Sequence, residues 1–96
     1  MKVVYRAAAL AEVREAVAWY LSEAGQRQAE AFHHELNAKV ALLVAHPGIG
    51  TPGEMGTRWM PLKVFPYTLH YRVDDNVFRV FAVAHQKRRP GYWLKR

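Results

Sequence analysis

The spacing of apolar residues changes partway along this chain, and that change limits the available folds more than any other feature. In the first half the apolar residues recur every three or four positions, the period of a helix with one buried face. A first helix is predicted to begin at Ala7 and to stop at Gly25, because glycine is common at left-handed helix ends. Its predicted buried stripe is Leu10, Val13, Val17, Tyr20 and Ala24.

A second helix is predicted to begin at Gln26 and to end at His46-Pro47-Gly48, where proline and glycine stop the helical pattern. One or two residues separate the two helices, so they must form a hairpin whose apolar faces need a common cover. The apolar stripe of the second helix is Ala29, Phe32, Leu36, Val40 and Leu43.

The second half of the chain carries the pattern of strands. Arg58–Val64 is predicted to be a strand in which Pro61 forces an edge position or a bulge. From Tyr67 to Val73 apolar and polar residues alternate, as on a sheet with one covered face. The turn residues Asp74-Asp75-Asn76 then lead into Val77–Ala84, an almost wholly apolar run typical of a central strand buried on both faces.

These elements, with a short β-branched strand at Lys2–Arg6, predict the order β-α-α-β-β-β. The expected fold is α+β, with a helical hairpin packed on one face of a mostly antiparallel sheet. The 96 residues suffice for one domain, which we expect to span residues 1–96. The chain has no cysteine, which excludes a disulfide scaffold, a thiol nucleophile and a thiolate metal site.

Charge is divided unevenly between the two halves. The formal net charge is +6, but residues 1–57 hold five basic and six acidic residues, whereas residues 58–96 hold nine basic and two acidic ones. The basic half predicts an acidic or polyanionic partner, although solubility alone is the competing explanation. Charged residues interrupt every apolar stretch, so neither a membrane span nor a signal peptide is expected, and the predicted location is the cytoplasm.

The densest group of cations and aromatic residues lies in the tail, from His85 to Arg96. Lysine and arginine can neutralise phosphates, and tyrosine and tryptophan can stack on bases or instead anchor the tail on the sheet. Lys95 and Arg96 are expected to be a frayed terminus. The candidate target-binding residues are Lys87, Arg88, Arg89, Tyr92 and Trp93.

A second candidate is a cationic site on the sheet, where Thr68, His70 and Arg72 form a polar stripe beside Arg58 and Lys63. If His85 ends near these cations, it could act as a general base while they stabilise a pentavalent phosphate. The alternatives are an ordinary exposed strand residue for His70 and a structural hydrogen bond for His85. No metal or cofactor is expected, since the adjacent His33 and His34 point about 100° apart on a helix.

The ordered set of motifs resembles the RelE/ParE superfamily of toxins from bacterial type II toxin–antitoxin modules. The resemblance covers nearly the whole chain and is carried by Trp19-Tyr20, Gly25, Ala29, Phe32, His46-Pro47-Gly48-Ile49-Gly50, Phe65-Pro66-Tyr67, Tyr71-Arg72-Val73 and Ala84-His85-Gln86-Lys87-Arg88-Arg89. It implies a fold of the kind described above and a cognate antitoxin with an acidic toxin-binding segment. Contact with operator DNA is expected only through that antitoxin.

The resemblance leaves the activity divided between two branches. RelE-like members cut mRNA on the ribosome without a metal, whereas ParE-like members inhibit DNA gyrase. The hairpin and the loop at 47–50 favour the ParE branch, and the RelE branch has cations where this chain has Trp59, Met60, Pro61 and Thr68. Arg88 and Tyr92 do match the RelE-like site.

The resulting prediction is a ParE-like, non-enzymatic toxin of a plasmid stabilisation module that arrests growth through gyrase. The first alternative is a metal-independent, ribosome-dependent mRNA endonuclease. The second is a degenerate, non-toxic member that only binds its antitoxin. The candidate catalytic residues of the endonuclease are Arg58, Lys63, Arg72, His85, Arg88 and Tyr92.

Overall fold

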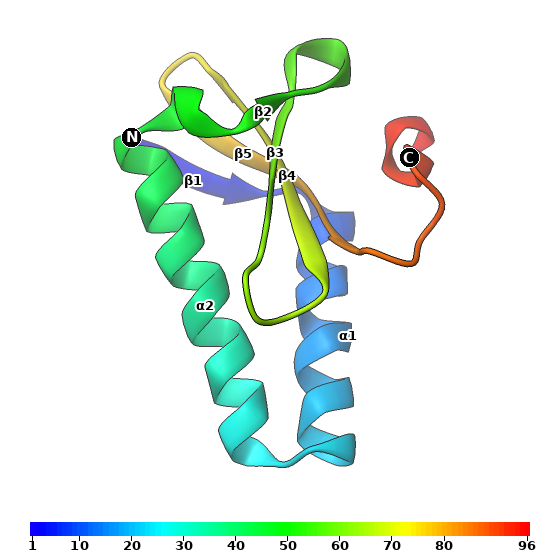
Figure 1. Cartoon of the computed structure of the whole chain (residues 1–96). Coiled ribbons are helices and arrows are strands. Elements are labelled where there is room, and N and C mark those ends of the chain that lie inside the picture. The colour runs from blue at the N-terminus through cyan, green and yellow to red at the C-terminus, as the bar shows by residue number, and fades with distance from the viewer.

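The computed structural model describes residues 1–96 and contains two helices packed on a five-stranded sheet. Helix α1 spans Ala7–Glu23 and helix α2 spans Gln26–Ala45, and the two run antiparallel (Figure 1). The strands are β1 (Lys2–Tyr5), β2 (Thr51–Pro52), β3 (Arg58–Pro61), β4 (Tyr67–Asp74) and β5 (Val77–His85). Short 3-10 helices are η1 (Pro47–Ile49), η2 (Glu54–Gly56) and η3 (Tyr92–Lys95). The predicted α+β fold is confirmed.

The strand order in the sheet is β1-β5-β4-β3-β2. Strand β1 runs parallel to β5 and every other pair is antiparallel. Strand β5 therefore has neighbours on both sides, and all of its residues from Val80 to Ala84 are buried, as its apolar sequence predicts. None of the helices combines the length and the apolar character needed to cross a membrane.

The two helices differ in how well their spacing predicts the buried face. All five apolar residues predicted for α2 are buried. In α1 the buried residues are Ala9, Val13 and Ala16, whereas Leu10, Val17 and Tyr20 are only half-buried and Ala24 is exposed. Val13 is thus buried as predicted, and Val17 and Tyr20 pack against the edge of the core. The prediction misses Ala9 and Ala16, which are buried because alanines without bulky side chains let this helix lie close to the sheet.

Strand β3 is shorter than predicted, since it ends at Pro61 and not at Val64. Residues 62–66 instead turn towards α2, where the carboxylate of Glu35 accepts hydrogen bonds from the backbone N–H groups of Lys63 and Val64. The prediction of an edge position for Pro61 is confirmed, because β2 pairs only with Arg58 and Trp59. The pairing of β2 itself has no signal in the loop sequence.

The side chain of Tyr71 joins the sheet to the loop after α2. This tyrosine is 1% exposed, and its hydroxyl donates to Pro47 O at 2.6 Å and accepts from Gly50 N–H at 3.2 Å. The ring leaves no space for a side chain at position 50, where an added Cβ would lie 2.3 Å from the Tyr71 hydroxyl oxygen.

Gly50→Ala is therefore expected to lower the free energy of unfolding by about 1–3 kcal/mol, because an overpacked side chain must displace a hydrogen-bonded ring. Urea unfolding measures this difference. Gly48→Ala is the matched control, since a Cβ at position 48 meets no atom within 4 Å. Equal stability of the two variants would contradict the close contact.

Candidate functional site

The candidate site lies at the end of β5, beyond the residues that pair with β1. Strand β1 pairs with β5 only as far as Val80, so the β1 side of the edge from residue 81 to residue 85 has no strand beside it. Side chains occupy this edge instead. Glu12 of α1 accepts a hydrogen bond from Val83 N–H at 2.9 Å, and Arg96 donates one to Phe81 O at 3.1 Å.

Glu12 also fastens the tail to α1, in what we call the tail latch (Glu12, Tyr92 and Arg96). The Arg96 guanidinium binds the Glu12 carboxylate through two hydrogen bonds of 2.8 and 2.9 Å, and the Tyr92 hydroxyl donates a short hydrogen bond to the same carboxylate. Arg96 is thus not the frayed terminus that the sequence predicts, because a bidentate ion pair and a backbone contact hold it.

The tail latch shifts the pKa values of its acidic groups. Burial acts to raise the pKa of Glu12, but the hydrogen bonds from Arg96, Tyr92 and Val83 outweigh burial and leave that pKa below its ordinary value. Burial, together with the hydrogen bond to Glu12, raises the pKa of Tyr92 to about 12. The latch therefore consists of a carboxylate and a protonated phenol at neutral pH.

The tail packs on the face of the sheet that is turned away from the helices, which we call the open face. Trp93 is 6% exposed and its ring lies 4.7 Å from that of His70 and 6.0 Å from that of Phe81, measured between centroids. Arg88 lies with its guanidinium carbon 3.9 Å from the centre of the Tyr92 ring. Of the candidate target-binding residues, Trp93 is therefore a packing residue, while Lys87, Arg88 and Arg89 are exposed.

Packing also changes the interpretation of His70, which is half-buried and not an ordinary exposed strand residue. Burial lowers the pKa of His70 to about 4, from an ordinary value of 6.5. The free energy of unfolding is expected to fall as pH drops from about 6.5 towards 4, because the unfolded chain then binds a proton that the folded chain excludes. Above about pH 6.5 the histidine is neutral in both the folded and the unfolded chain, so it no longer makes the free energy of unfolding depend on pH.

Urea unfolding at several pH values measures this dependence. His70→Asn is expected to flatten it, whereas His33→Asn, at an exposed position of α2, is expected to leave it unchanged. An equally steep decline in both variants would show that the burial of His70 is not its cause.

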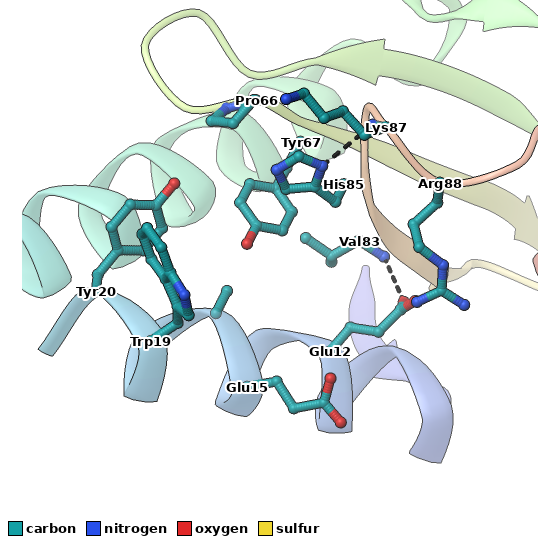
Figure 2. Close-up of a pocket in the computed structure, with 11 residues that line it drawn as sticks. Glu12, Glu15, Trp19, Tyr20, Pro66, Tyr67, Val83, His85, Lys87 and Arg88 are labelled. Carbon is teal, nitrogen blue, oxygen red and sulfur yellow. Dashed lines mark hydrogen bonds between the residues drawn. The ribbon is translucent and has the colours of Figure 1, made fainter. Parts of the chain in front are cut away.

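A groove of about 500 Å³ runs between α1 and the end of β5 (Figure 2). Its walls carry opposite charges, with Glu12 and Glu15 on α1 and Lys87 and Arg88 on the tail. Aromatic residues line the remainder, namely Trp19, Tyr20 and Tyr67. This arrangement suits a partner segment that has apolar residues and charges of both signs.

His85 borders the groove, with its ring 5.1 Å from that of Tyr67. Its Nδ1 accepts a hydrogen bond from Lys87 N–H at 3.1 Å, which is drawn in Figure 2. The structural hydrogen bond foreseen for this histidine is present, and it holds the start of the tail.

The six candidate catalytic residues lie in three places: one group of three, one group of two, and one residue by itself. His85, Arg88 and Tyr92 line one hollow of about 350 Å³ on the open face. Arg58 and Arg72 line another hollow, of about 190 Å³. Lys63 lies in the exposed turn beside Glu35.

Hydrogen bonds hold Arg58 and Arg72 away from the hollow that His85 lines. Arg58 donates to Gly50 O at 2.8 Å, and Arg72 binds Asp74 at 2.8 Å. Phosphoryl chemistry needs donors that converge on one phosphate, and this geometry brings together three of the six residues.

Sequence reasoning missed the contribution of Glu12 to this site. A single glutamate on the polar side of an amphipathic helix has no signature that separates it from a solvated residue. Only the long-range contacts to Val83, Tyr92 and Arg96 reveal its role. The structure contains no group of three or more His, Cys, Asp or Glu side chains placed to hold a metal ion.

Comparison with known proteins bears on the fold and the family. The family model described as "ParE toxin of type II toxin-antitoxin system, parDE" matches residues 3–90. A solved structure titled "Chromosomal ParDE TA system from P. aeruginosa" is similar in fold, with a TM-score of 0.77 and 23% identity over 88% of this chain and 95% of that one. Among curated proteins there is no significant match.

Proposed function

Because this chain belongs to the ParE toxin family of type II toxin–antitoxin systems, we propose that it arrests growth by inhibiting DNA gyrase. The proposal places its action in the cytoplasm and its biological role in plasmid stabilisation. The observation that carries it is the family match over residues 3–90. The separation of Arg58, Lys63 and Arg72 from His85 supports inhibition by binding over catalysis.

The proposed gyrase-binding surface is the exposed, basic start of the tail, from Lys87 to Arg89. The tail latch and the buried Trp93 hold this segment against the sheet from its far end. A surface held in one conformation loses little entropy on binding, which favours a stable complex with the target.

The proposed second partner is an acidic antitoxin. The basic residues of the second half would speed its association by electrostatic attraction. The groove beside α1 offers apolar area, including Trp19, whose 57% exposure is unusual for a residue of its size. Antitoxin bound along this groove would meet Lys87 and Arg88 and would cover part of the proposed gyrase-binding surface.

Replacing both Arg88 and Arg89 with alanine is expected to weaken growth arrest at least tenfold in the inducer concentration required, because both side chains are exposed and carry charge for target binding. Their removal should leave the thermal unfolding midpoint within about 2 °C of wild type. Arg14→Ala with Arg27→Ala removes the same charge from the helices and should keep toxicity. Full growth arrest by the tail variant would remove Arg88 and Arg89 from the site.

Induced expression in bacteria tests the toxin assignment itself. Growth should stop on induction and resume when the short reading frame beside the gene is co-expressed as the antitoxin. Expression without any effect on growth, together with tight binding of that neighbour, would instead support a degenerate member that only binds its antitoxin.

The endonuclease remains a second candidate because His85, Arg88 and Tyr92 line one hollow. It predicts cleavage of ribosome-bound mRNA, mapped by primer extension. Tyr92→Phe separates the two candidates, since it removes the phenolic proton while keeping the ring beneath Arg88. An endonuclease that uses this tyrosine would lose cleavage, whereas gyrase inhibition is expected to persist, because the two hydrogen bonds from Arg96 to Glu12 still hold the latch.

A further inference from the structure

Three arginines border one hollow with Phe81 on the open face, and we call them the arginine cluster (Arg6, Arg72 and Arg79). The guanidinium carbons of Arg6 and Arg72 lie 4.5 and 4.9 Å from the centre of the Phe81 ring. Arg79 lies directly opposite Arg72 in the register of β4 and β5. Both flat groups over the ring are thus held in position by cation–π contacts.

This arrangement is unfavourable for the isolated chain. Like charges directly opposite each other in a sheet are destabilising. Asp74 offsets part of the repulsion by accepting hydrogen bonds from Arg72 Nε at 2.8 Å and Arg79 Nε at 3.1 Å. These hydrogen bonds hold the pKa of Asp74 below its ordinary value. A pair of like charges on neighbouring strands is unfavourable for folding, and unfavourable local choices of this kind are expected at functional sites.

The cluster retains capacity to bind an anion. Both contacts to Asp74 use Nε, so the terminal amino groups of Arg79 remain without a hydrogen-bond partner in the protein. Arg6 forms no ion pair and no side-chain hydrogen bond, although it lies over Phe81. The three arginines border an open hollow of about 590 Å³ together with Asp74, Asp75 and Met55.

A second group of cations lies along the same face. Arg88 and Arg89 line a hollow with Thr68 and His70, which project from the open face of β4. Thr68 borders the hollow of Arg88 and Arg89, and Arg72 belongs to the arginine cluster. These two residues lie four positions apart on β4, which separates the two groups by about 13 Å at about 3.3 Å per residue. The open face thus carries positive charge at both ends of its longest strand.

We propose that the open face binds the phosphate backbone of duplex DNA directly, with the arginine cluster and Arg88-Arg89 as its two contacts. Guanidinium groups bind phosphate oxygens in pairs. A duplex advances about 3.4 Å per base pair, so about four base pairs bridge the two groups. The choice of DNA among polyanions rests on the proposed action at gyrase, an enzyme that works on duplex DNA.

The packing of the aromatic residues favours a duplex over a single strand. Bases of single-stranded nucleic acid bind by stacking on exposed aromatic rings. At the arginine cluster Phe81 is covered by guanidinium groups, and Trp93 is buried, so neither ring offers a free face. Trp59, which is 37% exposed beside Arg88 and Arg89, is the aromatic ring of the open face that a base could reach. Contacts through the arginine cluster are therefore made to the backbone, which makes them independent of sequence and distinct from operator recognition by an antitoxin.

Fluorescence anisotropy of the purified full chain with a labelled 20-base-pair duplex tests this proposal. Wild type should bind with an affinity that falls as KCl rises. Replacing Arg6 and Arg79 with alanine should reduce the slope of log K against log[KCl] by about 1.8, at about 0.9 for each lost phosphate contact. Replacing both with lysine should keep the slope. The control pair Arg14→Ala and Arg27→Ala changes the net charge equally and should leave the slope unchanged, with circular dichroism verifying the fold of each variant.

No salt-dependent binding of the duplex, or equal loss in the cluster and control pairs, would overturn the proposal. Binding of polyglutamate without binding of DNA would also overturn it and would identify a site for an acidic peptide. Gyrase is absent from this experiment, so a negative result leaves gyrase inhibition standing. Conversely, DNA binding without gyrase inhibition would contradict only the proposed function.

Discussion

Replacing Phe32 with alanine is expected to lower the free energy of unfolding by about 3–5 kcal/mol, because it empties the centre of the core. This side chain is fully buried on α2. Its ring lies 5.1 Å from that of Tyr67 and 5.5 Å from those of Tyr20 and Phe65, so one residue joins both helices to the sheet. Aromatic pairs of this geometry add stabilisation beyond that of buried area.

Urea unfolding followed by circular dichroism measures the effect of Phe32→Ala. His33→Ala, at the neighbouring exposed position, should change the free energy of unfolding by less than about 0.5 kcal/mol. Phe32→Leu should fall between the two, since it keeps most of the apolar volume. A loss below about 1 kcal/mol for Phe32→Ala would mean that the hairpin is not packed through this ring.

The second large effect is expected at the tail latch. Glu12→Ala removes the acceptor from Val83 N–H, from the Tyr92 hydroxyl and from Arg96 in a single step. Donors left without partners cost about 1–3 kcal/mol each when buried. Because this site is partly open to water, we expect a total loss of about 2–4 kcal/mol and release of the tail.

Limited trypsin digestion detects that release, since Lys87 and Arg88 lie in the segment that the latch restrains, whereas the bond between Arg89 and Pro90 resists trypsin. Cleavage there should be at least tenfold faster in Glu12→Ala than in Glu15→Ala, which removes a charge from an exposed position of the same helix. Because the pKa of Glu12 is lower in the folded chain than in the unfolded chain, the contribution of the latch to the free energy of unfolding should be lost in acid, as the pH falls through the pKa of the folded chain, which urea unfolding at several pH values measures. Equal cleavage rates in the two variants would show that the latch does not hold the tail.

The fold could be predicted from the sequence where side-chain spacing and burial agree. The spacing of the apolar residues of α2 from Ala29 to Leu43 correctly predicts which side chains are buried, and so does the apolar run of β5. In α1 that agreement fails, because Ala9 and Ala16 give a weaker periodic signal than Leu10 and Val17 but pack closer to the sheet. Strand β2 escapes prediction because its two residues pair through backbone atoms alone.

The candidate site was less predictable than the fold. Local composition identifies the basic tail, and the exposed Lys87, Arg88 and Arg89 lie where that composition suggests. The contacts that shape the site join residues some 70 to 84 positions apart, as between Glu12 and Val83 or Arg96. The net charge also does not reveal that Asp74 forms ion pairs with two arginines on neighbouring strands.

We propose that this member of the ParE toxin family acts on DNA gyrase through its basic tail. Supercoiling of relaxed plasmid by purified gyrase, with wild type and the Arg88→Ala, Arg89→Ala variant compared side by side, tests it most directly. Wild type is expected to block supercoiling and to trap cleaved DNA, and the variant is expected to do so at least tenfold less effectively. Unimpaired gyrase alongside cleavage of ribosome-bound mRNA by the same preparation would contradict it.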